Sequence, residues 1–149
     1  MDITLIVDSR EQLPYKLDTP SEVAGLPCGD YSIKGLEGRI SIERKSLDDL
    51  IGCLTSGRAR FERELHKGRA LDHFSLVVEG TMKDILDHRY TSKMLPQSAL
   101  QSLVAFSVRY RLPVWFCGNR RDAKLITESL LLKYARELEK AYHGIQKGP

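Results

Sequence analysis

Residues 28–45, CGDYSIKGLEGRISIERK, predict a β-hairpin that turns over the central GLEG segment. Glycines at both ends of such a short loop allow the backbone dihedrals that a tight turn requires. If the turn is symmetric, Tyr31 lies opposite Ile42 and Asp30 lies opposite Glu43. Side chains alternate between the two faces of a strand, so the hairpin has one apolar and one polar face. The apolar face carries Tyr31, Ile33, Ile40 and Ile42, and the polar face carries Asp30, Ser32, Ser41, Glu43 and Lys45.

The opposed carboxylates of Asp30 and Glu43 are a candidate metal site. Directly opposed Cβ atoms lie about 4.5 to 5.5 Å apart, where two like charges destabilise a sheet unless a cation joins them. Oxygen ligands suit Mg²⁺ or Mn²⁺, and Mg²⁺ is commonly held by one or two carboxylates with waters and substrate phosphate. Lys45 projects from the same face, where an ammonium can orient an attacking water and stabilise a phosphodiester as it is cleaved. The alternative is an ordinary solvated strand face, because short acid-and-lysine patterns are common.

The rest of the chain predicts an α/β protein. Its length favours a single domain spanning residues 1–149. Apolar runs predict strands, and apolar residues at helical spacing behind capping residues predict helices. Besides the hairpin, strands are expected at 3–8, 74–79 and 114–117, helices after Ser46 and at 58–71, 96–110 and 119–142, and irregular structure at 13–27. This order indicates a mixed central sheet flanked by helices.

Composition excludes several classes of protein. Hydrophobic residues make up 42% and charged residues 29% of the chain, which is ordinary for a folded globular domain. The three cysteines form no C-x-x-C pair, so neither a disulfide framework nor a zinc site is expected. With no basic leader and no apolar run near about 18 residues, we expect no membrane contact and a location in the cytoplasm or with cellular DNA. The net charge of +3 does not by itself predict a nucleic-acid partner.

Three segments resemble a known family. VDSRE (7–11), Gly29-Asp30 and ERKSLDD (43–49) resemble the nuclease domain of the XPF-type structure-specific endonucleases, whose signature is G-D…E-R-K-x-x-x-D. The resemblance implies a restriction-endonuclease-like fold, dependence on Mg²⁺ with Mn²⁺ able to substitute, and a homodimer. It also implies cleavage of DNA at flaps, forks or junctions, in DNA repair or recombination.

The same resemblance assigns roles to residues. It implies that Asp30 and Glu43 bind the metal and that Lys45 is the catalytic lysine. Other residues at family positions needed for activity are Asp8, Glu11, Arg44 and Asp49. Arg44 lies on the opposite face of the predicted strand from Glu43, so it is expected to contribute its backbone or a structural pairing. The alternative for Asp49 is an acid in the first turn of a helix capped by Ser46, and the alternative for Asp8 and Glu11 is ordinary strand-end polarity.

DNA binding and assembly are expected from other segments. Many family members append a helix-hairpin-helix module, for which this chain has no room before Pro149, so an accessory DNA-binding subunit is one expectation. Basic residues near the motif are expected to contact phosphates, and these are Arg10, Arg58, Arg60, Arg63 and Lys67. The alternative is a solvated helix with internal ion pairs. A homodimer is expected to use apolar residues that could instead pack on the domain's own sheet, namely Ile126, Leu130, Leu131, Tyr134 and Leu138.

The leading hypothesis from the sequence is a metal-dependent endodeoxyribonuclease that hydrolyses phosphodiester bonds in branched or structured DNA. One rival is a catalytically silent DNA-binding or scaffolding subunit with the same fold. Another is a junction resolvase or a nuclease of ordinary duplex. The signature positions are all intact, which favours an enzyme over a silent subunit.

Overall fold

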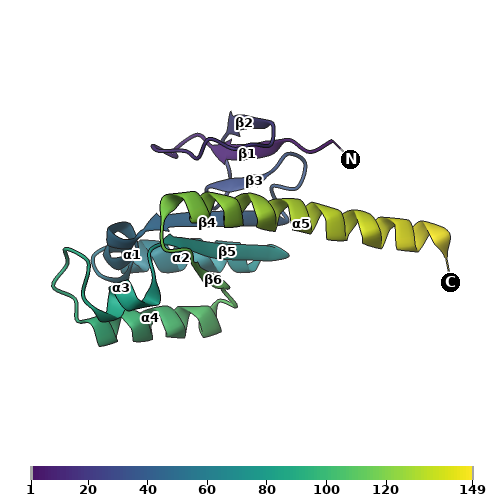
Figure 1. Cartoon of the computed structure of the whole chain (residues 1–149). Coiled ribbons are helices and arrows are strands. Elements are labelled where there is room, and N and C mark those ends of the chain that lie inside the picture. Colours follow the sequence, from purple (N-terminus) through teal and green to yellow (C-terminus); the bar gives the residue numbers. More distant parts are fainter. Residues whose placement is uncertain (1, 149) are drawn as a thin grey trace.

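The computed structural model describes residues 2–148, which form a six-stranded sheet between helices (Figure 1). The order of strands across the sheet is β2-β1-β3-β4-β5-β6. The strands are β1 Leu5–Asp8, β2 Ser21–Ala24, β3 Tyr31–Ile33, β4 Ile40–Ser46, β5 His73–Glu79 and β6 Val114–Phe116. The helices are α1 Leu47–Leu54, α2 Arg58–Arg69, α3 Met82–Leu86, α4 Pro96–Arg109 and α5 Arg120–Lys147. The predicted mixed α/β architecture is confirmed.

The sheet has its antiparallel part at one side and its parallel part at the other. β3 runs antiparallel to both β1 and β4, whereas β4, β5 and β6 run parallel to one another. Tyr31 pairs with Ile42, which is the register that a symmetric hairpin predicts. The long β4–β5 pairing carries β4 to Ser46, whose side chain accepts the Asp49 N–H and begins α1. The hairpin and the start of α1 therefore form one continuous support for the signature residues.

Each face of the sheet packs into its own apolar core. Helix α5 crosses one face and contacts β3, β4 and β5. The opposite face is covered by α1 and α2, with α4 packed behind α1. The core under α5 holds residues such as Tyr31, Ile42, Val77 and Leu131, and the other core holds residues such as Leu50, Phe61, Leu76 and Phe106. The C-terminal part of α5 extends past the sheet (Figure 1).

Three local features differ from the sequence predictions. The segment 13–27 contains the edge strand β2, whose four residues are all exposed and so show no apolar alternation. The short helix α3 is also absent from the predictions, although Thr81 and Asp84 form a reciprocal capping box at its start. Helix α5 continues to Lys147, beyond the predicted end at Tyr142.

The predicted polar face of the hairpin is only partly a solvated face. Ser32 and Ser41 are fully buried, and their hydroxyls donate to backbone carbonyls. The serines therefore belong to the packing of the sheet, and only the far end of this face opens into a cleft.

The apolar residues of α5 that motivated the homodimer serve the protein's own fold. Leu131 is buried in the core under α5, and Ile126, Leu130 and Tyr134 pack against that core. Packing on the domain's own sheet, the alternative considered from the sequence, therefore accounts for these four residues, whereas the half-buried Leu138 is not part of that core. None of the described helices is both long and apolar enough to cross a membrane.

Candidate active site

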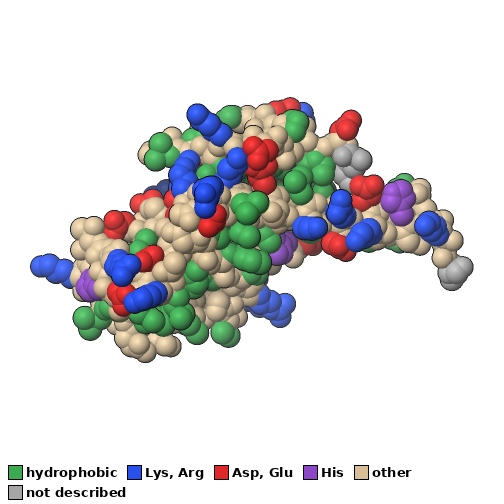
Figure 2. Space-filling view, viewed as in Figure 1, with side chains coloured by type: hydrophobic (Ala, Val, Ile, Leu, Met, Phe, Trp, Pro, Cys, Tyr) green, Lys and Arg blue, Asp and Glu red, His purple; other side chains and the backbone are tan. Residues whose placement is uncertain are grey.

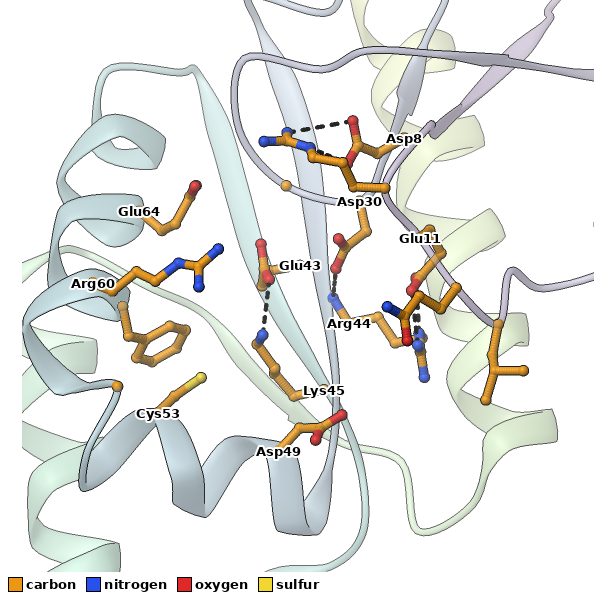
Figure 3. Close-up of a pocket in the computed structure, with 16 residues that line it drawn as sticks. Asp8, Glu11, Asp30, Glu43, Arg44, Lys45, Asp49, Cys53, Arg60 and Glu64 are labelled. Carbon is orange, nitrogen blue, oxygen red and sulfur yellow. Dashed lines mark hydrogen bonds and ion pairs between the residues drawn. The ribbon is translucent and has the colours of Figure 1, made fainter.

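A cleft of about 480 Å³ opens where β4 meets α1 and α2 (Figure 3). It brings together residues from every segment of the sequence signature. The predicted residues that line it are Asp8, Arg10, Glu11, Asp30, Glu43, Arg44, Lys45, Asp49 and Arg60. The other three basic residues predicted to bind DNA, Arg58, Arg63 and Lys67, belong to α2 but not to this lining.

Asp30 is held in place by backbone hydrogen bonds on both sides. Its N–H donates to the Ile42 carbonyl at 2.9 Å, and its carbonyl accepts the Asp8 N–H at 2.8 Å. Its carboxylate accepts the Arg44 N–H at 2.8 Å. The preceding Gly29 has a φ of +77°, and a Cβ there would overlap the Ser41 side chain. The chain can therefore make this tight approach to β4 only with glycine before Asp30.

Glu43 and Lys45 point into the cleft beside Asp30 (Figure 3). The Glu43 side chain is 10% exposed, and its Oε1 lies 3.4 Å from the Lys45 Nζ. Lys45 also lies over the Phe61 ring, with the Nζ 6.0 Å from the ring centroid. The aromatic ring and the adjacent carboxylate both orient the ammonium toward the space in front of the two acids.

The electrostatics of the two acids favour a bound cation. Burial raises the pKa of Asp30, and the pKa of Glu43 is raised by burial and then by the Asp30 charge. Burial acts to lower the pKa of Lys45, but the pKa is raised overall because Glu43 and Asp30 face the ammonium. Two carboxylates that are costly to ionise together become favourable ligands once a divalent cation supplies the missing positive charge.

The donor set fits Mg²⁺ or Mn²⁺. Asp30 and Glu43 offer only oxygen atoms, which these hard cations prefer. A further cleft residue, Glu64 of α2, has a buried Oε2 without a hydrogen-bond partner, so the cleft holds more acidic oxygen than protein donors satisfy. Among the described residues, no three Asp, Glu, His or Cys side chains are grouped around a single ion position. Two carboxylates could hold such a cation only with water and phosphate completing its shell.

Arg44 lies on the opposite face of β4 and is fixed by two buried acids. Its guanidinium donates to Glu11 at 2.8 and 2.9 Å and to Glu79 at 3.2 and 3.3 Å. Tyr15 donates to Glu79 at 2.6 Å, and Arg120 of α5 lies over the Tyr15 ring at 4.7 Å. Arg44 is thereby held in a buried ionic network behind the cleft. Glu11 is its partner, and the Arg44 backbone N–H reaches Asp30.

Asp8 supports the loop that leads to Asp30. It is 3% exposed and accepts the Leu26 N–H at 2.8 Å. Arg10 donates to Asp8 at 2.9 Å and to the Leu26 carbonyl at 2.9 Å, while 68% of its side chain stays exposed at the rim of the cleft. Asp8 therefore has a buried, structural set of contacts, and Arg10 remains accessible to a ligand.

The remaining predicted residues differ in how far they face the cleft. Asp49 is exposed on the first turn of α1, and its N–H donates to Ser46. Arg60 and Arg63 are exposed on α2. Arg58 instead turns toward α4, where it donates to Ser102 at 2.9 Å and lies 4.8 Å from the centroid of the Phe106 ring. These contacts give Arg58 a packing role that its sequence position did not indicate.

Several residues of the site were missed by the sequence reasoning. Glu64 and Cys53 line the cleft, while Tyr15, Glu79 and Arg120 complete the network behind it. Helical spacing could have found Glu64, because it lies four residues after Arg60 and so shares its face of α2. The network residues come from segments far apart in the sequence, and no local pattern connects them.

The mixed sheet and the convergence of Asp30, Glu43 and Lys45 place the chain in the class of restriction-endonuclease-like α/β folds. More narrowly, the chain belongs to the ERCC4 domain family, whose sequence model matches residues 7–130. The resemblance noted from the sequence is thereby confirmed. No curated protein sequence matches the chain.

Solved structures show the same fold. XPF from Aeropyrum pernix is similar with a TM-score of 0.71 and 22% identity, covering 94% of this chain and 69% of that one. A structure of XPF from Aeropyrum pernix in complex with DNA is similar with a TM-score of 0.69 and 22% identity, covering 91% of this chain and 66% of that one. The chain thus spans about two thirds of the length of either structure.

Proposed function

We propose that this protein is a Mg²⁺-dependent endonuclease, with Mn²⁺ able to substitute, that hydrolyses phosphodiester bonds in branched or otherwise structured DNA. The observation that carries the proposal is the convergence of Asp30, Glu43 and Lys45 in one cleft. Membership of the ERCC4 domain family supports it. The similar XPF from Aeropyrum pernix was solved in complex with DNA, which supports DNA as the ligand.

In this proposal the two acids hold the cation and the lysine acts on the reacting phosphate. The cation would polarise the phosphate and lower the pKa of a bound water. Asp30 is oriented for this role by the Arg44 N–H, and Glu43 by its ion pair with Lys45. Lys45 would orient the attacking water and stabilise the negative charge that develops on the phosphate oxygens. Arg10 and Arg60 are at the cleft and can bind flanking phosphates.

The proposal is tested by incubating the protein with labelled flap, fork, four-way junction and plain duplex DNA in Mg²⁺, Mn²⁺ or EDTA. We expect cleavage of the branched substrates in either metal and none in EDTA. Equal cleavage of plain duplex would favour the rival duplex nuclease, and cleavage confined to four-way junctions would favour a resolvase. DNA binding without cleavage of any substrate would identify a silent binding or scaffolding subunit.

We also propose that the protein is a homodimer, with an accessory DNA-binding subunit as a further partner. Because the core-facing residues of α5 are engaged in the fold, a dimer has to use other apolar side chains. Val108 of α4 is 76% exposed and Trp115 of β6 is 43% exposed. Sedimentation at tens of micromolar, roughly the range of a weak interface, should show a dimer. A monomer at that concentration would contradict the proposal.

A further inference from the structure

The C-terminal part of helix α5 carries basic residues that the proposed mechanism does not use. This part of the helix extends past the sheet, and Figure 2 shows several Lys and Arg side chains along it. Five of its residues are spaced three or four apart, so they follow one face of the helix as a basic stripe. The stripe consists of Lys133, Arg136, Lys140, His143 and Lys147. All five are exposed, so this face of α5 is open to a partner.

The basic stripe borders a groove of about 700 Å³. Four of the five stripe residues line this groove, and Ile3, which precedes β1, also lines it. The groove is separate from the cleft, because the two share no lining residue. Leu131 and Ala135 of the same helix are buried in the core, so α5 is fixed to the sheet by a different face. The fold therefore holds the stripe at the groove without using it for packing.

The positive charge of the stripe is only partly offset by the helix itself. The acids of this part of α5 form the pairs Lys140–Glu137 at 3.4 Å and His143–Glu139 at 3.6 Å. Among residues 2–148, no carboxylate pairs with Lys133 or Arg136. Two charges at the wall of the groove are thus available to an anionic partner.

The stripe lies at a distance from the cleft that about one turn of duplex DNA can span. Helix α5 begins at Arg120, which pairs with Glu79 at 3.5 Å in the network behind the cleft. At about 1.5 Å per residue, the stripe occupies the helix from about 20 to 40 Å beyond that point. One turn of B-DNA is about 34 Å long. A duplex arm that follows the length of α5 away from the cleft therefore reaches the stripe.

We propose that the basic stripe binds the phosphate backbone of a duplex arm of the DNA whose reacting strand lies in the cleft. This inference rests on the proposed function, to which it adds a second contact with the substrate. Duplex DNA carries one negative charge per about 1.7 Å of its axis, so many phosphates lie within the length of the stripe. Contacts of this kind position a duplex without reading its sequence.

The test measures binding of a labelled fork with 20-base-pair arms by fluorescence anisotropy in EDTA at several salt concentrations. The double variant Lys133→Ala, Arg136→Ala should bind more weakly, and the slope of log K against log salt should fall by about 1.8 if each residue binds one phosphate. The matched control is Lys34→Ala, Lys83→Ala, which removes the same charge from exposed lysines that line neither the cleft nor the groove. The control should keep the wild-type slope, and circular dichroism checks that each variant is folded.

Hydroxyl-radical footprinting of the same complexes locates the contact. For the wild type we expect a second protected segment about 6 to 12 base pairs from the one at the cleft, since each base pair spans about 3.4 Å. The double variant should lose the second segment and keep the first. A wild type without a second segment would overturn the proposal.

The remaining outcomes separate this inference from the proposed function. A double variant with the wild-type slope would overturn the role of the stripe and leave the proposed nuclease site standing. An equal loss in the control would overturn it too, because the effect would then come from total charge. Wild-type DNA binding together with altered sedimentation of the double variant would make the stripe an interface between copies of the chain. A wild type that binds no DNA would overturn DNA as the ligand in the proposed function, and the inference with it.

Discussion

Replacing Glu43 with glutamine should stabilise the metal-free protein at pH 8. The pKa of Glu43 is raised from 4.5 to about 8, mainly by burial and then by Asp30, so its ionised form is disfavoured in the folded state. Between those pH values the folded protein binds more protons than the unfolded chain, and stability therefore falls as pH rises through this window. Glutamine keeps the shape of the side chain and removes the charge, so it should remove most of this loss.

The magnitude follows from the same interval. Each unit by which the Glu43 pKa is raised costs the folded protein about 1.4 kcal/mol once the carboxylate is ionised. The rise from 4.5 to about 8 therefore limits the gain in the free energy of unfolding to about 5 kcal/mol at pH 8. Asp30 titrates with Glu43, and Lys45 loses its partner in the variant, so we expect a net gain of about 1 to 3 kcal/mol. For a domain of this size, that corresponds to a rise in Tm of roughly 3 to 10 °C.

The assay is urea and thermal unfolding in EDTA at pH 5 and pH 8. Wild type should be less stable at pH 8 than Glu43→Gln, and the two should converge at pH 5, where Glu43 is protonated in the folded wild type. Glu62→Gln is the control, because its carboxylate lies outside the cleft and is expected to leave the pH dependence unchanged. If Glu43→Gln unfolds at or below the wild-type urea concentration at pH 8, the electrostatic account of the site is wrong.

Three further predictions address the surroundings of the site. The triple variant Arg60→Ala, Arg63→Ala and Lys67→Ala should weaken DNA binding. The slope of log K against log salt should fall by about 0.9 for each phosphate that the variant no longer binds. An unchanged slope would show that this face of α2 does not meet DNA. Arg44→Ala should destabilise the fold by about 3 to 5 kcal/mol in urea unfolding, because it leaves the buried Glu11 carboxylate without its ion-pair partner and Glu79 with only Tyr15 and Arg120. A loss below about 1 kcal/mol would contradict that role. Lys45→Ala should still bind Mn²⁺ but should cleave DNA more slowly, by a factor of about 10² to 10³ in single-turnover reactions, because the charge that stabilises the reacting phosphate is gone. A variant that cleaves at the wild-type rate would remove Lys45 from the mechanism.

The hairpin could be predicted because its determinants are local. Two glycines mark the turn, and the two-residue period then fixes which side chains face one another, so the pairing of Tyr31 with Ile42 follows from the sequence. The edge strand β2 lacks both signals, since its residues are exposed and no glycine turn joins it to β1. It pairs in parallel across a long connection, which a local pattern does not specify.

The residues behind and beside the site show where sequence reasoning stops. Arg58 looked equivalent to Arg60, but the packing of α2 near α4 directs Arg58 onto Phe106. Glu79 meets Arg44 because β5 is parallel to β4, and Arg120 meets Glu79 because α5 starts nearby. Such roles depend on how distant elements pack, and they become visible only in three dimensions.

The basic side chains on the surface differ in where they lie relative to the cleft. Basic side chains are spread over several elements in Figure 2, in keeping with a net charge of only +3. Arg10 and Arg60 differ from these scattered charges because they lie at the cleft that holds the two acids. We therefore expect Arg10 and Arg60 to bind phosphate because of their place at the cleft, and not because of the total charge of the protein.

The most direct test of the proposed site is cleavage of a branched DNA substrate in Mg²⁺ by purified Asp30→Asn. Asparagine retains the shape of the side chain and can still accept the Arg44 N–H, so the variant should fold while losing the charge of one proposed cation ligand. We predict that cleavage collapses while DNA binding in EDTA persists or improves, because an anionic cleft repels phosphate. Cleavage at close to the wild-type rate by folded Asp30→Asn would contradict the assignment of the metal site and the mechanism built on it.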